Sequence, residues 1–141
     1  MHPYPDYRIA VEAIIVHDRK VLLTKRADDG SWYVPAGKAR YEETPKEAIF
    51  RETREETNLE AESVEELHVR AFKGTKASGE FFYRVMYTYL VRPRNGDIGG
   101  FRLNDEHSDY AWVDAQGIRD LRYDSLQPDV RRIIADVLSS L

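Results

Sequence analysis

The sequence contains no cysteine in its 141 residues. Disulfide bonds, thiolate catalysis and a zinc site built on cysteine are therefore excluded. Long apolar runs are also missing, because no stretch approaches the roughly 20 apolar residues that a membrane-spanning helix requires. The opening residues, MHPYPDYR, lack the basic and then apolar order of a secretory signal. We therefore expect a cytoplasmic protein with no membrane contact.

An excess of positive charge is also missing. The chain has 21 Lys and Arg against 25 Asp and Glu, a formal net charge of −4 at pH 7. This balance provides no general surface for a nucleic-acid polymer, whose phosphates attract basic patches. A small nucleotide stays open as a substrate, because a bound cation can neutralise its phosphates. The length fits a single domain over residues 1–141, large enough to bury a core, and no repeat or linker is apparent.

Local patterns predict an alternation of strands and helices. Residues rich in β-branched and aromatic side chains mark the predicted strands, which are 9–16, 21–25, 60–70, 81–91 and 110–114. A polar turn over residues 17–20 predicts that the first two strands form a hairpin. Helical segments are expected over residues 115–121 and 128–141, in addition to one that begins at Thr44. This order indicates the α/β or α+β class.

Alternate residues of the predicted strand 81–91 share one face of the sheet. On one of its faces these residues are Phe81, Tyr83, Val85, Tyr87 and Tyr89. Such an aromatic face either packs in the core or stacks against a nucleobase, and we expect core packing.

Three residues predict the start of a helix within the highly charged stretch 37–59. Thr44 can cap the helix, Pro45 suits its first turn, and Glu47 stands at the spacing of a capping box. The segment that follows is therefore expected to be helical up to residue 58.

On this helix, Glu52, Glu55 and Glu56 stand at positions i, i+3 and i+4, so their carboxylates share one face. Like charges at this spacing repel one another and destabilise an isolated helix. A face rich in oxygen atoms suits a hard divalent cation such as Mg²⁺. The alternative is a solvated acidic face, which is the commoner situation for glutamate-rich helices.

The wider spacing resembles the signature of the Nudix hydrolases (MutT-like), G-x5-E-x7-R-E-U-x-E-E-x-G-U, in which U is a bulky aliphatic residue. The matching residues are Gly37, Glu43, Arg51, Glu52, Glu55, Glu56 and Leu59. Thr53 stands where an aliphatic residue is usual, and Asn58 stands where glycine is usual. Asn58 is a mild change, because asparagine is the next best residue after glycine for a left-handed helix cap.

The resemblance implies a Nudix-type α/β/α sandwich with a central mixed sheet. It also implies the metal-dependent attack of water on a diphosphate linked to another moiety, with Mg²⁺ as cofactor and Mn²⁺ as an alternative. The metal ligands that it implies are the carboxylates of Glu52, Glu55 and Glu56 and the backbone carbonyl of Ala36.

Three residues of the signature region have further implied roles. In related proteins Glu52 acts either as a metal ligand or as the group that activates water. Arg51 and Glu43 are implied to form an ion pair that fixes the loop against the helix. Ala36 replaces the first glycine of the common W-x-x-P-G-G sequence, and alanine would be strained if this position required a positive φ.

Three further candidates lie outside the signature. Glu106 stands six residues before Trp112, which resembles a family arrangement that supplies an extra metal ligand or a catalytic base. His107 competes with it for proton transfer, since an unperturbed histidine titrates near neutral pH. Arg26 lies at the end of a predicted strand and is a candidate contact to a substrate phosphate. For both Glu106 and Arg26, the alternative is simple exposure to solvent.

The sequence contains no marker that selects one substrate. A nucleoside triphosphate, including an oxidised one, cleaved to monophosphate and pyrophosphate is our first expectation. A nucleotide sugar or a dinucleotide is the alternative, and a homodimer is a further option that the resemblance offers. From a different functional class, the second hypothesis is a nucleotide-binding regulator with a Nudix fold and no turnover, although such proteins commonly lose the carboxylates that this chain retains. The third hypothesis is an accidental match on an acidic surface helix.

Overall fold

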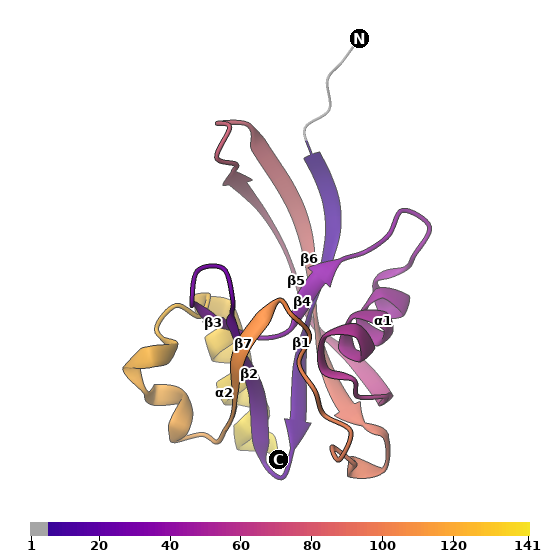
Figure 1. The fold of residues 1–141 in the computed structure, drawn as a ribbon, viewed down its shortest axis with the longest axis vertical. Coiled ribbons are helices and arrows are strands. Elements are labelled where there is room, and N and C mark those ends of the chain that lie inside the picture. Colours follow the sequence, from indigo (N-terminus) through magenta and orange to yellow (C-terminus); the bar gives the residue numbers. More distant parts are fainter. Residues whose placement is uncertain (1–5) are drawn as a thin grey trace.

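The computed structural model describes residues 6–141, in which a mixed sheet lies between two helices (Figure 1). Its strands are β1 (Asp6–His17), β2 (Lys20–Arg26), β3 (Trp32–Tyr33), β4 (Ala36–Lys38), β5 (Ala61–Thr75), β6 (Phe81–Pro93) and β7 (His107–Val113). The helices are α1 (Pro45–Thr57) and α2 (Pro128–Ser140). Neither helix has the length and apolar character that a membrane crossing would need within residues 6–141.

The strand order is β3-β2-β1-β6-β5, with β4 paired to β1 and β7 paired to β2. The long pairing of β1 with β6 is parallel, whereas the other pairings are antiparallel. The predicted mixed sheet is therefore confirmed. The predicted hairpin is also confirmed: Asp18 and Arg19, with φ of 50° and 60°, form the two-residue turn between β1 and β2.

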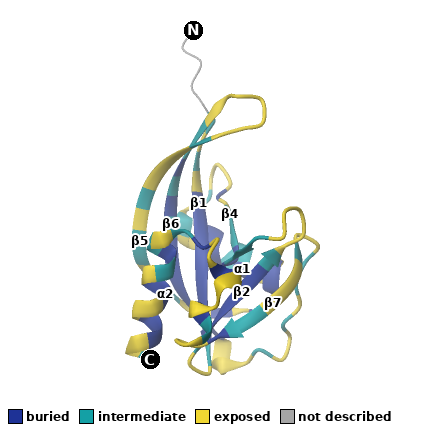
Figure 2. Cartoon of the chain, turned by 90° about the vertical axis from the view of Figure 1, so that its left-hand side faces the viewer, coloured by how far each residue is buried: buried dark blue, intermediate teal, exposed yellow. Residues whose placement is uncertain are grey.

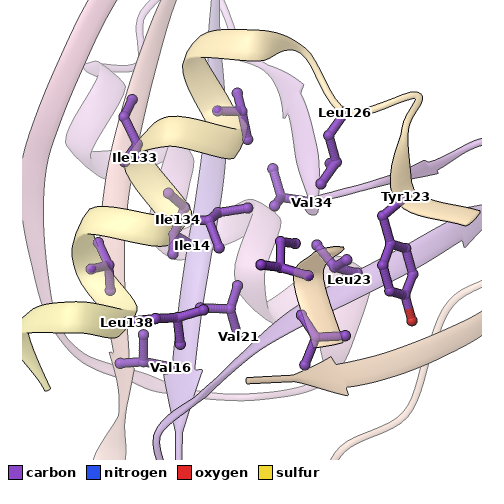
Figure 3. Close-up of a cluster of buried hydrophobic side chains, with 14 of the residues drawn as sticks. Ile14, Val16, Val21, Leu23, Val34, Tyr123, Leu126, Ile133, Ile134 and Leu138 are labelled. Carbon is purple, nitrogen blue, oxygen red and sulfur yellow. The ribbon is translucent and has the colours of Figure 1, made fainter. Parts of the chain in front are cut away.

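Two apolar clusters hold the helices on opposite faces of the sheet. Because side chains alternate along a strand, β1 contributes Ile14 to the cluster under α2 and Ile15 to the cluster under α1. Figure 3 shows Ile134 of α2 beside Ile14, and Leu138 of α2 beside Val16 and Val21, in the first cluster. Together these layers form the predicted α/β/α sandwich.

The outer ends of β1, β5 and β6 project beyond both clusters as an arm, which comprises residues 6–10, 69–75 and 81–86 (Figures 1 and 2). The aromatic face predicted for strand 81–91 crosses this boundary. Tyr89 is buried under α1, as expected, but Phe81 at the tip of the arm is 48% exposed. Core packing therefore holds only for the inner half of that face.

The predicted helix over residues 115–121 is wrong. The structure has two short 3₁₀ helices there, Gly117–Arg119 and Leu121–Tyr123. Asp120 interrupts them with an extended backbone, and its side chain accepts a hydrogen bond from the backbone N–H of Arg122. An aspartate that bonds to the backbone in this way competes with helix continuation.

The sheet strands are longer than predicted. β5 continues to Thr75, past the expected end at residue 70, because its residues pair in sequence with β6 up to Phe81. β7 begins at His107 rather than at residue 110, since its first residues pair with the end of β2. Backbone pairing with a distant strand leaves little trace in local composition.

Candidate active site

The α1 helix begins and ends where the sequence predicts. The Thr44 hydroxyl accepts from the backbone N–H of Glu47 at 3.1 Å, and the Glu47 carboxylate accepts from the backbone N–H of Thr44 at 3.0 Å. This is the predicted capping box. At the other end, Asn58 has φ of 60° and donates its backbone N–H to the Arg54 carbonyl at 2.9 Å. Asparagine therefore takes the left-handed position without changing the cap.

The strand β4 lies directly against the α1 carboxylates. A Cβ atom added to Gly37 would lie 2.3 Å from Cδ of Glu52, so glycine is needed to let this carboxylate approach the backbone. Ala36 pairs with Glu12 of β1 and does not have a positive φ. Alanine at this position is therefore unstrained, and the residue lines both hollows described below.

Arg51 holds the acidic residues of α1 and of the preceding loop together. Its guanidinium donates two hydrogen bonds of 2.7 Å to the carboxylate of Glu43. It also donates to Glu52 at 2.8 Å, to Glu55 at 3.0 Å and to the Lys38 carbonyl at 3.2 Å. The hydrogen bonds from Arg51 lower the pKa of Glu43 to about 2. Glu43 is thus ionised near neutral pH, and it lines neither of the two cavities described below.

Glu56 is the most deeply placed carboxylate of the set. It is only 2% exposed, and its Oε2 atom finds no hydrogen-bond partner within residues 6–141. Burial, together with the negative charges of Glu52 and Glu106, raises the pKa of Glu56 to about 9. A buried acceptor without a partner is costly, so this atom is a position where a proton or a cation is favoured.

No three His, Cys, Asp or Glu side chains of residues 6–141 already surround one point as metal ligands. Arg51 accounts for part of this absence, because it donates a hydrogen bond to one carboxylate oxygen of Glu52 and to one of Glu55. The donor set nevertheless fits a hard cation. Burial also raises the pKa of Glu52, and the charges of Glu55 and Glu106 act in the same direction. A cation bound to Glu56 Oε2 would give this buried atom a partner. It would also reduce the repulsion among the neighbouring carboxylates.

The loop before β7 and the first residue of that strand bring Glu106 and His107 close to Glu56. The Glu106 carbonyl accepts from the backbone N–H of Ala27 at 2.9 Å, which ties this loop to the end of β2. Nε2 of His107 lies 3.8 Å from Oε1 of Glu56, and its Nδ1 lies 3.1 Å from Oδ1 of Asn104. Burial lowers the pKa of His107, which favours the neutral ring.

Two hollows meet at these residues. The first is a cavity of about 410 Å³ whose walls include Arg26, Tyr33, Ala36, Glu56, Glu106 and His107. The second is a groove of about 760 Å³ that runs from Gly37 and Glu52 to the arm. Both share Arg26, Ala36 and Glu106, so the candidate metal-binding residues lie at the boundary between them.

The structure therefore brings together most of the predicted site residues. Those that line the hollows are Arg26, Ala36, Glu52, Glu56 and Glu106. Arg51 and Glu43 stand behind them, and Glu55, with a side chain 47% exposed, lies at the outer edge. Arg26 forms two hydrogen bonds with Asp28, at 3.0 and 2.8 Å, so a phosphate at this position would compete with that carboxylate.

Sequence reasoning missed the residues of the groove on the arm. These are Lys38, Phe72, Lys76, Phe82, Arg84 and Met86. The pattern along residues 81–91 marks the odd-numbered face as the aromatic one, whereas the even-numbered face carries a single aromatic residue, Phe82. The pairing of β5 and β1 with β6 is what gathers Phe72, Phe82 and Arg84 on the even-numbered face.

Comparison with known proteins agrees with this geometry. A family model for the NUDIX domain matches residues 6–137. The chain is 36% identical over 93 residues to an RNA pyrophosphohydrolase of Acinetobacter baylyi, which covers 65% of this chain and 51% of that protein. The chain spans about half or less of the length of the curated relatives that it matches.

Solved structures share the fold. The structure of a MutT NUDIX hydrolase from Burkholderia pseudomallei is 26% identical, covers 93% of this chain and 97% of its own, and superposes with a TM-score of 0.69. A bifunctional NMN adenylyltransferase/ADP-ribose pyrophosphatase from Francisella tularensis, in complex with AMP and a manganese ion, has a TM-score of 0.68 at 20% identity, covering 99% of this chain and 43% of that one. The family model matches nearly the whole chain, and the signature, the sandwich and the carboxylate cluster agree with it. The protein therefore belongs to the Nudix family.

Proposed function

We propose that this protein hydrolyses a phosphoanhydride bond in a nucleoside diphosphate linked to another moiety, with Mg²⁺ as cofactor and Mn²⁺ as an alternative. The observation that carries the proposal is the buried Oε2 atom of Glu56, which has no partner in residues 6–141 and lies among other carboxylates at the wall of a cavity. Membership in the Nudix family supports it. The relatives named as pyrophosphohydrolases support the type of bond.

The residues that would hold the cation are the carboxylates of Glu52, Glu55, Glu56 and Glu106 and the carbonyl of Ala36. When bound, a divalent cation neutralises phosphate charge and lowers the pKa of a water ligand. Glu55 would have to exchange its ion pair with Arg51, at 3.0 Å, for this role. Arg51 would still be anchored by Glu43, so the helix and its preceding loop would stay in register.

Three groups are candidates for accepting the proton of the attacking water. Glu52 and Glu106 both line the groove, and each is close enough to Glu56 to raise its pKa. His107 is favoured in its neutral form and lines the first cavity, which suits a base near neutral pH. Arg26 lines both hollows and is our candidate contact to a substrate phosphate.

The exchange Glu56→Gln tests the proposal. It keeps the shape of the side chain but cannot ionise to bind a cation, so we expect turnover to fall by at least about 100-fold, more than the loss of a residue that only supports a metal ligand causes. The fold should be retained, because the amide is neutral and similar in shape to the protonated carboxyl that the raised pKa of Glu56 favours. The measurement is release of phosphate or pyrophosphate from a panel of nucleotides with Mg²⁺ or Mn²⁺.

Glu65→Gln is the matched control for this experiment, since Glu65 is an exposed glutamate on β5 outside both hollows. Near-normal hydrolysis by Glu56→Gln would contradict the assignment. The same panel separates the alternative functional class: tight nucleotide binding without hydrolysis by the unaltered protein would favour a regulator. The absence of both activity and metal binding would favour an accidental match of the carboxylates.

The panel also ranks substrates within the proposed class. A nucleoside triphosphate, including an oxidised one, would yield monophosphate and pyrophosphate. A nucleotide sugar or a dinucleotide would yield two phosphate monoesters. The family resemblance does not choose between these substrates, so the panel has to decide.

A further inference from the structure

The segment 100–106, which leads into β7, is hydrogen-bonded to the C-terminal end of α1. The carbonyl groups in the last turn of a helix have no partner within the helix, so they need one from elsewhere. The Thr57 carbonyl accepts from the backbone N–H of Arg102 at 2.9 Å. The Glu56 carbonyl accepts from the backbone N–H of Asn104 at 3.3 Å. These two bonds hold the backbone of Asn104 beside the most deeply buried carboxylate of the candidate site.

The side chain of Asn104 points along the chain toward the two residues that follow Asp105. Its Oδ1 atom accepts a hydrogen bond from the backbone N–H of Glu106 at 3.2 Å. The same atom lies 3.1 Å from Nδ1 of His107. A backbone N–H can only donate, so the oxygen of this amide, and not its NH₂ group, must occupy that position. The orientation of the Asn104 side chain is therefore fixed by the backbone.

This orientation decides which nitrogen of His107 carries the hydrogen. The amide oxygen of Asn104 can only accept, so Nδ1 must donate to it. In a neutral imidazole the other nitrogen then has no hydrogen and presents a lone pair. That nitrogen, Nε2, lies 3.8 Å from Oε1 of Glu56, and the His107 side chain is only 7% exposed. The ring thus presents an acceptor toward the carboxylates, which is what a group that takes a proton from water needs.

We propose that Asn104 is a positioning residue of the hydrolytic site. Its single Oδ1 atom fixes the backbone of Glu106 and holds the neutral ring of His107 in the form with hydrogen on Nδ1. Asn104 itself lines neither of the two hollows, so it acts through these two neighbours. The inference rests on the proposed function, because Glu106 and His107 are two of its candidate bases.

The form of the His107 ring can be measured without any hydrolysis. Long-range ¹H–¹⁵N NMR of the ¹⁵N-labelled full chain distinguishes the two neutral forms at about pH 8.5, roughly two units above the ordinary pKa of histidine. The chain has four histidines, and the signal that disappears in His107→Gln identifies the ring. We expect hydrogen on Nδ1 in the unaltered protein. A ring with hydrogen on Nε2 would overturn the inference, and this result needs no variant of Asn104.

Two variants of Asn104 separate its side-chain oxygen from its backbone. Asn104→Ala keeps the backbone bond to Glu56 and removes the acceptor, so the form with hydrogen on Nδ1 should lose its dominance. Asn104→Asp keeps an acceptor oxygen of similar shape and should retain that form. Ser108→Ala is the control, since Ser108 is an exposed neighbour of His107 that lines neither hollow. An unchanged ring in Asn104→Ala would contradict the role of the amide oxygen.

Kinetics with Mg²⁺ then test whether this arrangement serves the reaction. We expect kcat of Asn104→Ala to fall by roughly 10–100-fold with little change in KM, the range for the loss of a group that orients a metal ligand. Asn104→Asp should recover part of the loss, and Ser108→Ala should match the unaltered protein. A normal kcat for Asn104→Ala would overturn the inference and leave the proposed function intact. The absence of hydrolysis by the unaltered protein would overturn both.

Discussion

At the scale of single residues, Glu12 has no exposed surface although it interrupts an otherwise apolar part of β1. Its carboxylate accepts hydrogen bonds from the hydroxyl of Tyr33 at 2.5 Å, from the guanidinium of Arg70 at 2.7 Å and from the hydroxyl of Thr88 at 2.6 Å. The partners come from β3, β5 and β6, so this residue ties four strands together beneath the candidate site. Full pairing compensates for its removal from water.

We expect Glu12→Ala to lower the free energy of unfolding by about 3–5 kcal/mol, because it leaves the charge of Arg70 uncompensated. The Arg70 side chain is only 12% exposed, which limits its access to water. Urea denaturation at pH 7 measures the loss. The double variant Glu12→Leu with Arg70→Met should recover much of it, since both charges are then absent. A loss below about 1 kcal/mol in the single variant would show that the ion pair is not a strong structural tie.

Glu43 gives a prediction about pH. Its folded-state pKa of about 2 lies below the ordinary value of 4.5, so its stabilising effect is fully present above pH 4.5 and is lost as the pH falls through 2. Glu43→Gln should therefore reduce the free energy of unfolding at pH 7 by about 2 kcal/mol, the range of a hydrogen bond to a charged group. The difference from the unaltered protein should shrink as the pH falls from 4.5 to 2.

Urea denaturation at several pH values measures this difference. Glu42→Gln serves as the control, because Glu42 is an exposed neighbour in the same loop. A difference for Glu43→Gln that does not change with pH would show that the ion pair with Arg51 is not the source of the stability.

At the scale of elements, the site depends on how closely β4 and α1 approach each other. The start and end of α1 follow from local signals, namely the capping box at Thr44 and the left-handed residue Asn58. Thr53, which replaces a usual aliphatic residue, is buried, and its hydroxyl finds no partner among residues 6–141. Thr53 is thus buried at a position where the signature has an aliphatic residue, but its hydroxyl is left without a hydrogen bond.

Gly37→Ala tests the contact between these elements. An added Cβ would meet the Glu52 carboxylate at 2.3 to 2.5 Å, so this carboxylate would have to move from its place beside Arg51. We expect hydrolysis to fall by roughly 10–100-fold, as when a group that orients a metal ligand is removed. Stability should change little, because the displaced group is the flexible end of a side chain. Activity and a urea midpoint should be measured together.

Gly100→Ala is the control for this variant, since an added Cβ there would meet Asn58 only at an ordinary distance of 3.8 Å. Unchanged hydrolysis by Gly37→Ala would mean that the position of Glu52 is not critical. A collapse of stability would mean that the glycine serves the fold rather than the site.

At the scale of the whole molecule, the sandwich places the signature helix on one face of the sheet and the loop of Glu106 beside it. The arm then extends one wall of the site away from the body (Figure 1). This arrangement explains why two hollows rather than one meet at the carboxylates.

Elements with strong local chemistry could be predicted from the sequence. The hairpin turn, the capped helix α1 and the helix α2 depend on residues that are neighbours in the chain, and the structure confirms all three. The segment 115–121 could not be predicted correctly, because its apolar spacing is helical while Asp120 bonds locally to the backbone. The far ends of β5 and β7 were also missed, since their pairing is with distant strands.

The sequence by itself determined the identity of the acidic residues, their common face on α1 and the family that they indicate. The fixed spacing of a helix suffices for this, because residues at i, i+3 and i+4 meet without any tertiary contact. Only the tertiary structure decided that Glu56 is buried without a partner, that Glu106 and His107 join it, and that Glu12 is satisfied by three other strands. Burial and long-range pairing depend on which strands become neighbours, and a local pattern does not contain that information.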